Sequence, residues 1–261
     1  MRFILPILVL LLLLVPVQDP YTQHREQPQA APTADHWFGT DDYGRDVWAR
    51  FIHGGRWSIG VGVSATALCL LVAWTLGAAA ATSHLAGPVI VWLADLFLCL
   101  PWLYLLIGAR AMLPLQIESR TAFAMLLLLL ACTGWARPAK LVRGKVLEVR
   151  ERGYVRAAQR FGVSAPVVFI RHILPATLDL LLAQTLLLLP RFVLAELTLS
   201  FLGAGATEPH PGWGALVIPL KQAYTLETQW WRVLPLLAMI PFFVLCAWTG
   251  RRAEARYRTS R

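Results

Sequence analysis

Hydrophobic residues gather into six long segments along this 261-residue chain, and the polar stretches between them carry most of the charge. An apolar run of about 20 residues is long enough to cross the hydrocarbon core of a membrane as an α-helix. The pattern therefore predicts an all-α, polytopic membrane protein with about six transmembrane helices, at residues 3–17, 58–82, 88–108, 121–136, 176–200 and 233–250.

The first segment, Phe3 to Val17, is the shortest and follows Met1-Arg2, so it also resembles the core of a signal peptide. Residues 15–18, VPVQ, lack the small-x-small pattern of a cleavage site. We therefore expect the segment to be retained as a span. In either case the chain after it starts outside, so the downstream topology is unchanged.

The composition supports the membrane class. Hydrophobic residues make up 57% of the chain and charged residues 15%, whereas a soluble domain carries about 25% charged residues. The formal net charge of +9 is compatible with nucleic-acid binding, but basic membrane proteins usually owe such an excess to topology. Because no basic, aromatic-rich soluble module is present, we expect membrane lipid and no nucleic acid as surroundings.

Neither cysteine spacing nor acidic clusters predict a metal site. The stretch GTDDYGRD at 39–46 holds three aspartates but lacks the alternating oxygen ligands and final glutamate of a calcium loop. We expect a tight turn with local Asp–Arg pairing there. The four cysteines all lie inside apolar segments without metal-ligand spacing and are interpreted as small buried side chains: Cys69, Cys99, Cys132 and Cys246.

The distribution of basic residues predicts the orientation. With the N-terminus inside, the segments 1–2, 83–87, 137–172 and 251–261 hold 15 of the 24 Lys and Arg residues but only three acids. The outer segments hold eight basic and nine acidic residues. By the positive-inside rule, we expect a multi-pass inner-membrane protein with both termini and the long basic loop in the cytoplasm.

The basic loop contains a helical pattern. If residues 154–161 form a helix, Tyr154, Ala158 and Phe161 fall on one face, and arginines at 152, 156 and 160 form a second stripe. Ala157 and Ala158 carry little side-chain bulk, so a partner surface can approach closely. The pattern predicts an apolar knob with a basic edge.

The end of that helix is marked as well. Gly162 directly follows the predicted helix, at the position where helices commonly end with a glycine in the left-handed conformation. Ser164 can cap the next short helix, with Pro166 in its first turn, where a missing N–H costs little. We therefore predict a helix–Gly–helix elbow.

Three blocks resemble one family, the second permease subunit of the ATP-binding-cassette (ABC) importers for dipeptides, oligopeptides and nickel. The first, HWFGTDDYGRDVWARFIHG at 36–54, resembles that family's signature after the first span. The second is the loop RGYVRAAQRFGVSAPVVFIRHILP at 152–175, and the third is ELTLSFLGAGATEPHPGWG at 196–214. Asp95 in WLADLFLCLP also lies like an aspartate of the family. The blocks follow one another in family order.

The resemblance implies a type I ABC importer permease fold. Residues 1–57 would form an N-terminal transmembrane helix and periplasmic segment, residues 58–250 the permease transmembrane domain with a coupling loop at 137–175, and residues 251–261 a basic cytoplasmic tail. The implied partners are a second, similar permease subunit, two ATPase subunits and a periplasmic substrate-binding protein. The implied ATPase-coupling residues are Tyr154, Arg156, Ala157, Ala158, Phe161 and Gly162.

The chain departs from the family pattern in places. The glutamate at the head of the family's loop is Arg156 here, so any contact made by that glutamate is lost, replaced or charge-reversed. A serine of the first block is Ala49, and Arg191 is an unusual charge inside the fifth span. These differences bear on coupling strength and substrate type more than on class.

Ionisable residues inside predicted spans mark either a polar lining of the transport path or a buried structural pair, and both interpretations stay open. Asp95, Arg191 and Glu196 are the candidates for the path, with Asp179 at a span edge. Arg191 and Glu196 either pair with each other or each find a partner across helices, and we expect the second. Pro101 and Pro190 predict interruptions of otherwise continuous helices.

No catalytic constellation is visible. The phosphate-binding loop of an ATPase is absent, because Gly144-Lys145 is followed by valine and no glycine precedes it at the required spacing. We expect no enzyme activity and no cofactor in this chain, with ATP and Mg²⁺ used by the partner ATPase subunits. The expected substrate is a short peptide, with nickel or another small solute as the alternative. A membrane assembly or anchoring protein, or an intramembrane enzyme, are the competing classes.

Overall fold

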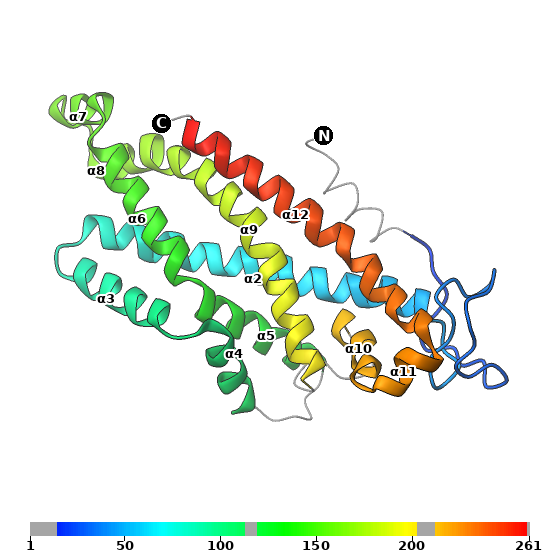
Figure 1. The fold of residues 1–261 in the computed structure, drawn as a ribbon. Helices are drawn as coiled ribbons and strands as arrows, with labels where there is room; N and C mark the ends of the chain where they lie inside the picture. Colours follow the sequence, from blue (N-terminus) through cyan, green and yellow to red (C-terminus); the bar gives the residue numbers. More distant parts are fainter. Residues whose placement is uncertain (1–14, 113–118, 203–211, 260–261) are drawn as a thin grey trace. The chain divides into compact units, whose positions relative to one another are not determined.

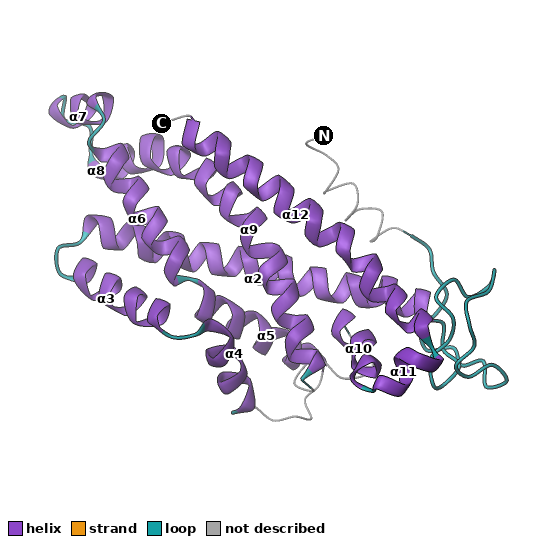
Figure 2. Cartoon of the chain, viewed as in Figure 1, coloured by secondary structure: helices purple, strands orange, loops and turns teal. Residues whose placement is uncertain are grey.

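The computed structural model describes residues 15–112, 119–202 and 212–259, and every regular element among them is helical (Figures 1 and 2). A π-helix covers Phe169–Ile173, and short 3-10 helices cover Ile218–Lys221 and Trp230–Val233. The α-helices are α2 (Val47–Thr82), α3 (Ala86–Cys99), α4 (Trp102–Ala111), α5 (Ser119–Gly134), α6 (Ala136–Arg150), α7 (Gly153–Arg160), α8 (Ala165–Val168), α9 (Leu174–Phe201), α10 (Trp213–Val217), α11 (Ala223–Thr228) and α12 (Leu234–Thr259).

The apolar segments of the sequence become helices of membrane-crossing length. Three described stretches are long and apolar enough to span a membrane singly: Val47–Thr82, Ala165–Phe201 and Trp230–Ala253. Two helix pairs reach that length only together, because α3 and α4 meet at a bend of 89° and α5 and α6 at one of 52°. The all-α, polytopic prediction is confirmed, while the first predicted span lies almost wholly outside the described residues.

The two prolines behave differently. Pro101 stands in the break between α3 and α4, as predicted, since it offers no backbone donor to continue the helix. Pro190 does not interrupt α9, so that prediction was wrong. Because Pro190 has no N–H, the carbonyl of Leu186 lacks its usual helical donor. This carbonyl lies beside Gly250 of α12, and its oxygen is 3.4 Å from the position that a Cβ on Gly250 would occupy. Close approach of a neighbouring helix is one way in which a membrane helix accommodates proline.

The chain divides into two compact units, each described on its own. The first contains residues up to 63, 113–126 and 189–249. Its buried aromatic core centres on Trp213, which is 1% exposed, stacks on Phe51 at 5.4 Å between ring centroids and meets Phe242 edge-on. The indole N–H of Trp213 donates to the backbone oxygen of Phe51 at 2.9 Å. This residue thereby joins α10 to α2 and α12.

Residues 19–46 of the same unit fold as a series of turns. Gly39 and Gly44 take positive φ angles of 71° and 72°, the left-handed region that glycine occupies without strain. Asp41 accepts hydrogen bonds from the side chains of Arg45 and Arg50 at 2.8 and 2.9 Å. The predicted turn with local Asp–Arg pairing is thus confirmed.

The second unit contains residues 64–112, 127–188 and 250 onward. Its core is aliphatic: Val142, Val146 and Val149 form a buried stripe along α6, joined by residues of α7, α8, the π-helix and α9. α2 and α6 approach so closely that a Cβ on Gly77 would lie 2.5 Å from the carbonyl oxygen of Ala139. Val155 of α7 belongs to this core. Figure 1 shows α7 beyond the end of α6.

A π-helix separates α8 from α9. The N–H of Leu174 bonds to the carbonyl of Phe169, five residues earlier, instead of four as in an α-helix. The turn is anchored in the core through Ile173, which is 4% exposed. Single π turns inside α-helices are uncommon and frequent at functional sites.

Candidate functional site

The elbow predicted at residues 152–175 exists, and α7 is its first arm. Val155 is fully buried against the aliphatic core of the second unit and Ala158 packs partly against it. Tyr154 is 49% exposed and Phe161 is 87% exposed. Of the predicted face, Tyr154 and Phe161 are therefore exposed, whereas Ala158 packs toward the core. The residue that anchors the helix, Val155, was not foreseen.

The glycine of the elbow closes α7 as predicted. Gly162 has a φ of 80°. Its N–H bonds to the oxygen of Gln159, and the N–H of Val163 bonds to the oxygen of Ala158, both at 3.1 Å. This pair of bonds is the Schellman arrangement, which satisfies carbonyls that the end of a helix leaves open.

The second arm begins as the sequence suggested, with one difference. Ser164 occupies the N-cap position of α8 and a proline stands in the first turn of that helix. The serine side chain makes no capping hydrogen bond, however, so the start of α8 is fixed by backbone geometry and Pro166.

The arginines of α7 turn toward acids at the end of α6. Arg152 donates to Glu148 at 2.9 Å, and this hydrogen bond holds the pKa of Arg152 above its ordinary value. Arg156, the residue that replaces the family's glutamate, forms an ion pair with Glu151. The reversed charge is thus matched within the chain, across the corner between α6 and α7.

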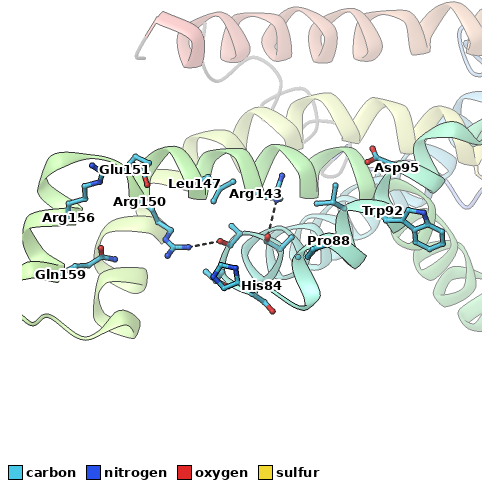
Figure 3. Close-up of a pocket in the computed structure, with 16 residues that line it drawn as sticks. His84, Pro88, Trp92, Asp95, Arg143, Leu147, Arg150, Glu151, Arg156 and Gln159 are labelled. Atoms are coloured by element: carbon cyan, nitrogen blue, oxygen red, sulfur yellow. Dashed lines mark hydrogen bonds and ion pairs between the residues drawn. The ribbon is translucent and has the colours of Figure 1, made fainter.

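Asp95 also has a partner. It lies on α3 and forms an ion pair with Lys140 of α6, with both side chains 40–49% exposed. Figure 3 shows Asp95 at one end of a cleft whose other end holds Arg156 and Gln159 of α7. The carboxylate therefore lies along the same cleft as the elbow.

Glu196 of α9 is fully buried in the first unit, where two hydroxyls hold it. Ser58 of α2 donates to Oε2 at 2.6 Å and Ser200 donates to Oε1 at 2.9 Å. The Ser58 oxygen also accepts the backbone N–H of Trp213 at 2.9 Å. One hydroxyl thus connects α2, α9 and the start of α10. Such partners are required because an unsatisfied polar group is costly in a buried or apolar setting.

Glycines on either side of Trp213 make this network possible. A Cβ on Gly212 would lie 2.3 Å from Glu196 Oε1 and 2.7 Å from the Ser58 oxygen. A Cβ on Gly214 would lie 2.3 Å from Cβ of Ser200. The backbone before α10 therefore packs directly on the carboxyl group, with no room for any side chain.

Two of the three candidate path residues have identified partners. Glu196 accepts hydrogen bonds from Ser58 and Ser200 in the first unit, and Asp95 pairs with Lys140 in the second; Arg191 also has an interaction within the protein. The partners of Glu196 are thus identified, while the expectation that Arg191 has a separate partner stays a prediction. Sequence reasoning missed Ser58, whose only signal was a hydroxyl residue next to a long apolar run.

Comparisons with known proteins agree on one class. A family model described as a binding-protein-dependent transport system inner membrane component matches residues 71–258. The chain is 31% identical over 238 residues to a dipeptide transport system permease protein of Bacillus subtilis (strain 168), covering 88% of this chain and 71% of that protein.

Two further relatives are also named as peptide permeases. A putative peptide transport system permease protein of Brucella suis biovar 1 (strain 1330) is 33% identical over 208 residues, which is 80% of this chain and 68% of that protein. An oligopeptide transport system permease protein of Bacillus subtilis (strain 168) is 30% identical over 217 residues, covering 82% and 69%.

Proposed function

Because this chain belongs to the family of inner-membrane components of binding-protein-dependent transport systems, we propose that it is a permease subunit of an ATP-driven importer for short peptides. Together with a second, similar permease subunit it forms the path into which a periplasmic binding protein releases substrate. The helices of membrane-crossing length supply the wall of such a path.

The substrate class is supported by the relatives. The dipeptide and oligopeptide permeases of Bacillus subtilis and the peptide permease of Brucella suis are all named for peptide transport. Each matches more than three quarters of this chain. Nickel or another small solute is the alternative cargo for the same machinery, and the uptake experiment below separates the two.

One observation supports the coupling part of the proposal. The elbow is anchored to the buried core, yet it carries exposed aromatic side chains. Phe161 and Tyr154 project outward while Val155 fixes α7 to the core and Gly162 closes the helix. Phe161 is not isolated, because Tyr154, Val163 and Val167 of the same elbow are also exposed, and a group of exposed apolar side chains is typical of a protein contact. The occupant we propose is one of two ATPase subunits, which hydrolyse ATP with Mg²⁺.

The elbow suits the transmission of movement. Ala157 is exposed on α7 and carries only a methyl group, so a partner can approach the helix backbone closely at that position. A push on α7 is passed through Val155 to the buried valines of α6 and to α9. Closure of the ATPase pair then changes the access of the path, as a rigid-body or hinge transition.

The test is uptake of radiolabelled dialanine by cells that lack this gene and by the same cells complemented with variants. Gly162→Val should abolish most uptake while leaving the amount of inserted protein unchanged. A Cβ at Gly162 meets nothing within 4 Å, so the substitution acts through backbone strain at positive φ, worth about 1–2 kcal/mol. The β-branch adds to that strain.

Gly144→Ala is the matched control. Gly144 lies inside α6, where a Cβ also meets nothing within 4 Å, but its φ is helical, so alanine should be neutral or slightly stabilising. Normal uptake by Gly162→Val together with normal ATPase co-purification would refute the coupling role. Complementation of ⁶³Ni²⁺ uptake without dialanine uptake would replace the peptide by nickel as cargo.

A further inference from the structure

A polar cleft of about 880 Å³ lies beside the elbow, within the second unit. Its walls are the last turn of α2, the turn at residues 83–84, the first three turns of α3, the second half of α6 and residues 156 and 159 of α7. Figure 3 shows Arg143 and Arg150 reaching from α6 across this cleft toward the end of α2. Nothing in the proposed transport function accounts for it.

The two arginines carry charge that the chain does not neutralise. Arg150 donates to the carbonyl of Ala81 at 2.9 Å, and Arg143 donates to the carbonyl of Ala80 at 3.4 Å. Each bond uses one of the five N–H donors of a guanidinium. The partial negative charge at the C-terminus of α2 offsets part of the positive charge of the two arginines but does not neutralise them. Across the described residues, neither arginine has a carboxylate within ion-pair distance.

The acids that line the cleft are already paired. Asp95 forms an ion pair with Lys140, and Glu151 forms one with Arg156. The cleft therefore keeps a net charge of about two positive units, concentrated on Arg143 and Arg150. These lie seven residues apart, on one face of α6. Guanidinium groups match the oxygens of a phosphate with two parallel hydrogen bonds, so the complementary ligand is a phosphate anion.

An apolar stripe continues from the cleft along α3. Leu85, Val89, Trp92 and Leu96 follow the spacing of one helix face, and their side chains are 90%, 61%, 65% and 45% exposed. Trp92 also lines the cleft (Figure 3). An exposed indole next to basic residues is typical of the headgroup layer of a membrane. A soluble phosphate compound has no apolar chain to cover this stripe, whereas the acyl chains of a lipid can pack against it.

We propose that the cleft binds an anionic phospholipid of the cytoplasmic leaflet, with its phosphate on Arg143 and Arg150 and an acyl chain along the α3 stripe. The proposal rests on the expected topology, in which the basic loop lies on the cytoplasmic side, where anionic headgroups attract arginine. The bound lipid would link the end of α2 to α6, the helix that carries the elbow.

The test measures phosphatidylglycerol bound to the purified full chain by native mass spectrometry, with phosphatidylcholine as the neutral comparison. The double variant Arg143→Gln/Arg150→Gln should lower the apparent affinity for phosphatidylglycerol about 30-fold, with little effect on phosphatidylcholine. Arg143→Lys/Arg150→Lys keeps the charge and should retain most of the binding. This second variant separates loss of the site from loss of folding.

The matched control is Arg137→Gln/Arg160→Gln, which removes the same charge at two exposed arginines that do not line the cleft. It should change binding less than about twofold. An equal loss in this control would refute the proposal, because binding would then follow net charge alone.

Two further outcomes would also overturn it. If glycerol 3-phosphate displaces phosphatidylglycerol at equal concentration, the cleft is a site for soluble phosphate compounds. If the isolated chain binds the lipid but the transporter purified with its ATPase subunits does not, a protein segment occupies the cleft. Retention of phosphatidylglycerol in the assembled transporter is the expected result.

Discussion

Replacing Ser58 by alanine removes the hydroxyl shared by Glu196 and the backbone N–H of Trp213. Both groups are buried, with exposed fractions of 0% and 1%, and the two bonds measure 2.6 and 2.9 Å. A buried polar group left without a partner costs about 1–3 kcal/mol, so losing both partners should cost about 2–5 kcal/mol. Ser200→Ala removes one bond to the same carboxyl group and should cost about 1–3 kcal/mol.

The assay is equilibrium unfolding of the purified full chain in detergent micelles, with tryptophan fluorescence followed as sodium dodecyl sulfate is added. Thr198→Ala on α9 is the control. Its hydroxyl bonds only to the oxygen of Leu194 within the helix, so the change should stay within about 0.5 kcal/mol. If Ser58→Ala destabilises no more than Ser200→Ala, the shared hydroxyl does not hold the start of α10 and the reasoning fails.

Two further predictions concern the turns at residues 19–46 and the membrane topology. The hydrogen bond from Arg232 holds the pKa of Asp42 below its ordinary value of 3.8. The stabilisation is therefore present above that value and lost as pH falls through the lowered pKa. Asp42→Asn should remove this part of the acid dependence of the melting temperature; an unchanged acid profile would refute it. In a cysteine-free background, a cysteine at Gln27 should react with an impermeant maleimide outside the inner membrane, and one at Gln159 only after permeabilisation; the reverse pattern would overturn the topology.

The elbow was predictable because its signals are local. A glycine at positive φ, a serine before a short helix and a proline in the first turn all act within a few residues of their own position. The sequence therefore located Gly162 as the cap of α7 and Pro101 as a break. The same locality explains the error at Pro190, since a membrane helix can accommodate a proline through neighbouring groups that local sequence does not reveal.

The partners of the intramembrane carboxyl group were not predictable. The place of Glu196 in an apolar run marked it as unusual. Its partner Ser58, however, lies 138 residues away in the sequence, and the N–H that bonds to the Ser58 oxygen belongs to Trp213 on a third helix. Hydrophobic periodicity carries no information on such pairings. The burial of Val155 beneath a more exposed Tyr154 likewise follows from packing of α7 against valines of α6.

The π turn at residues 169–173 sets the phase between the elbow and the span that follows it. It accommodates one residue more than an α-helical turn, so α9 starts about 100° out of register with a helix wound uniformly from α8. The extra residue therefore determines which side chains of α9 meet the core once α7 is docked. Deleting one residue within 169–173 would let this turn close as an ordinary α-helical turn, with the elbow and α9 keeping their places. The same deletion in a wholly α-helical stretch of α9 has no spare residue to absorb it and would rotate the elbow by about 100° about the helix axis.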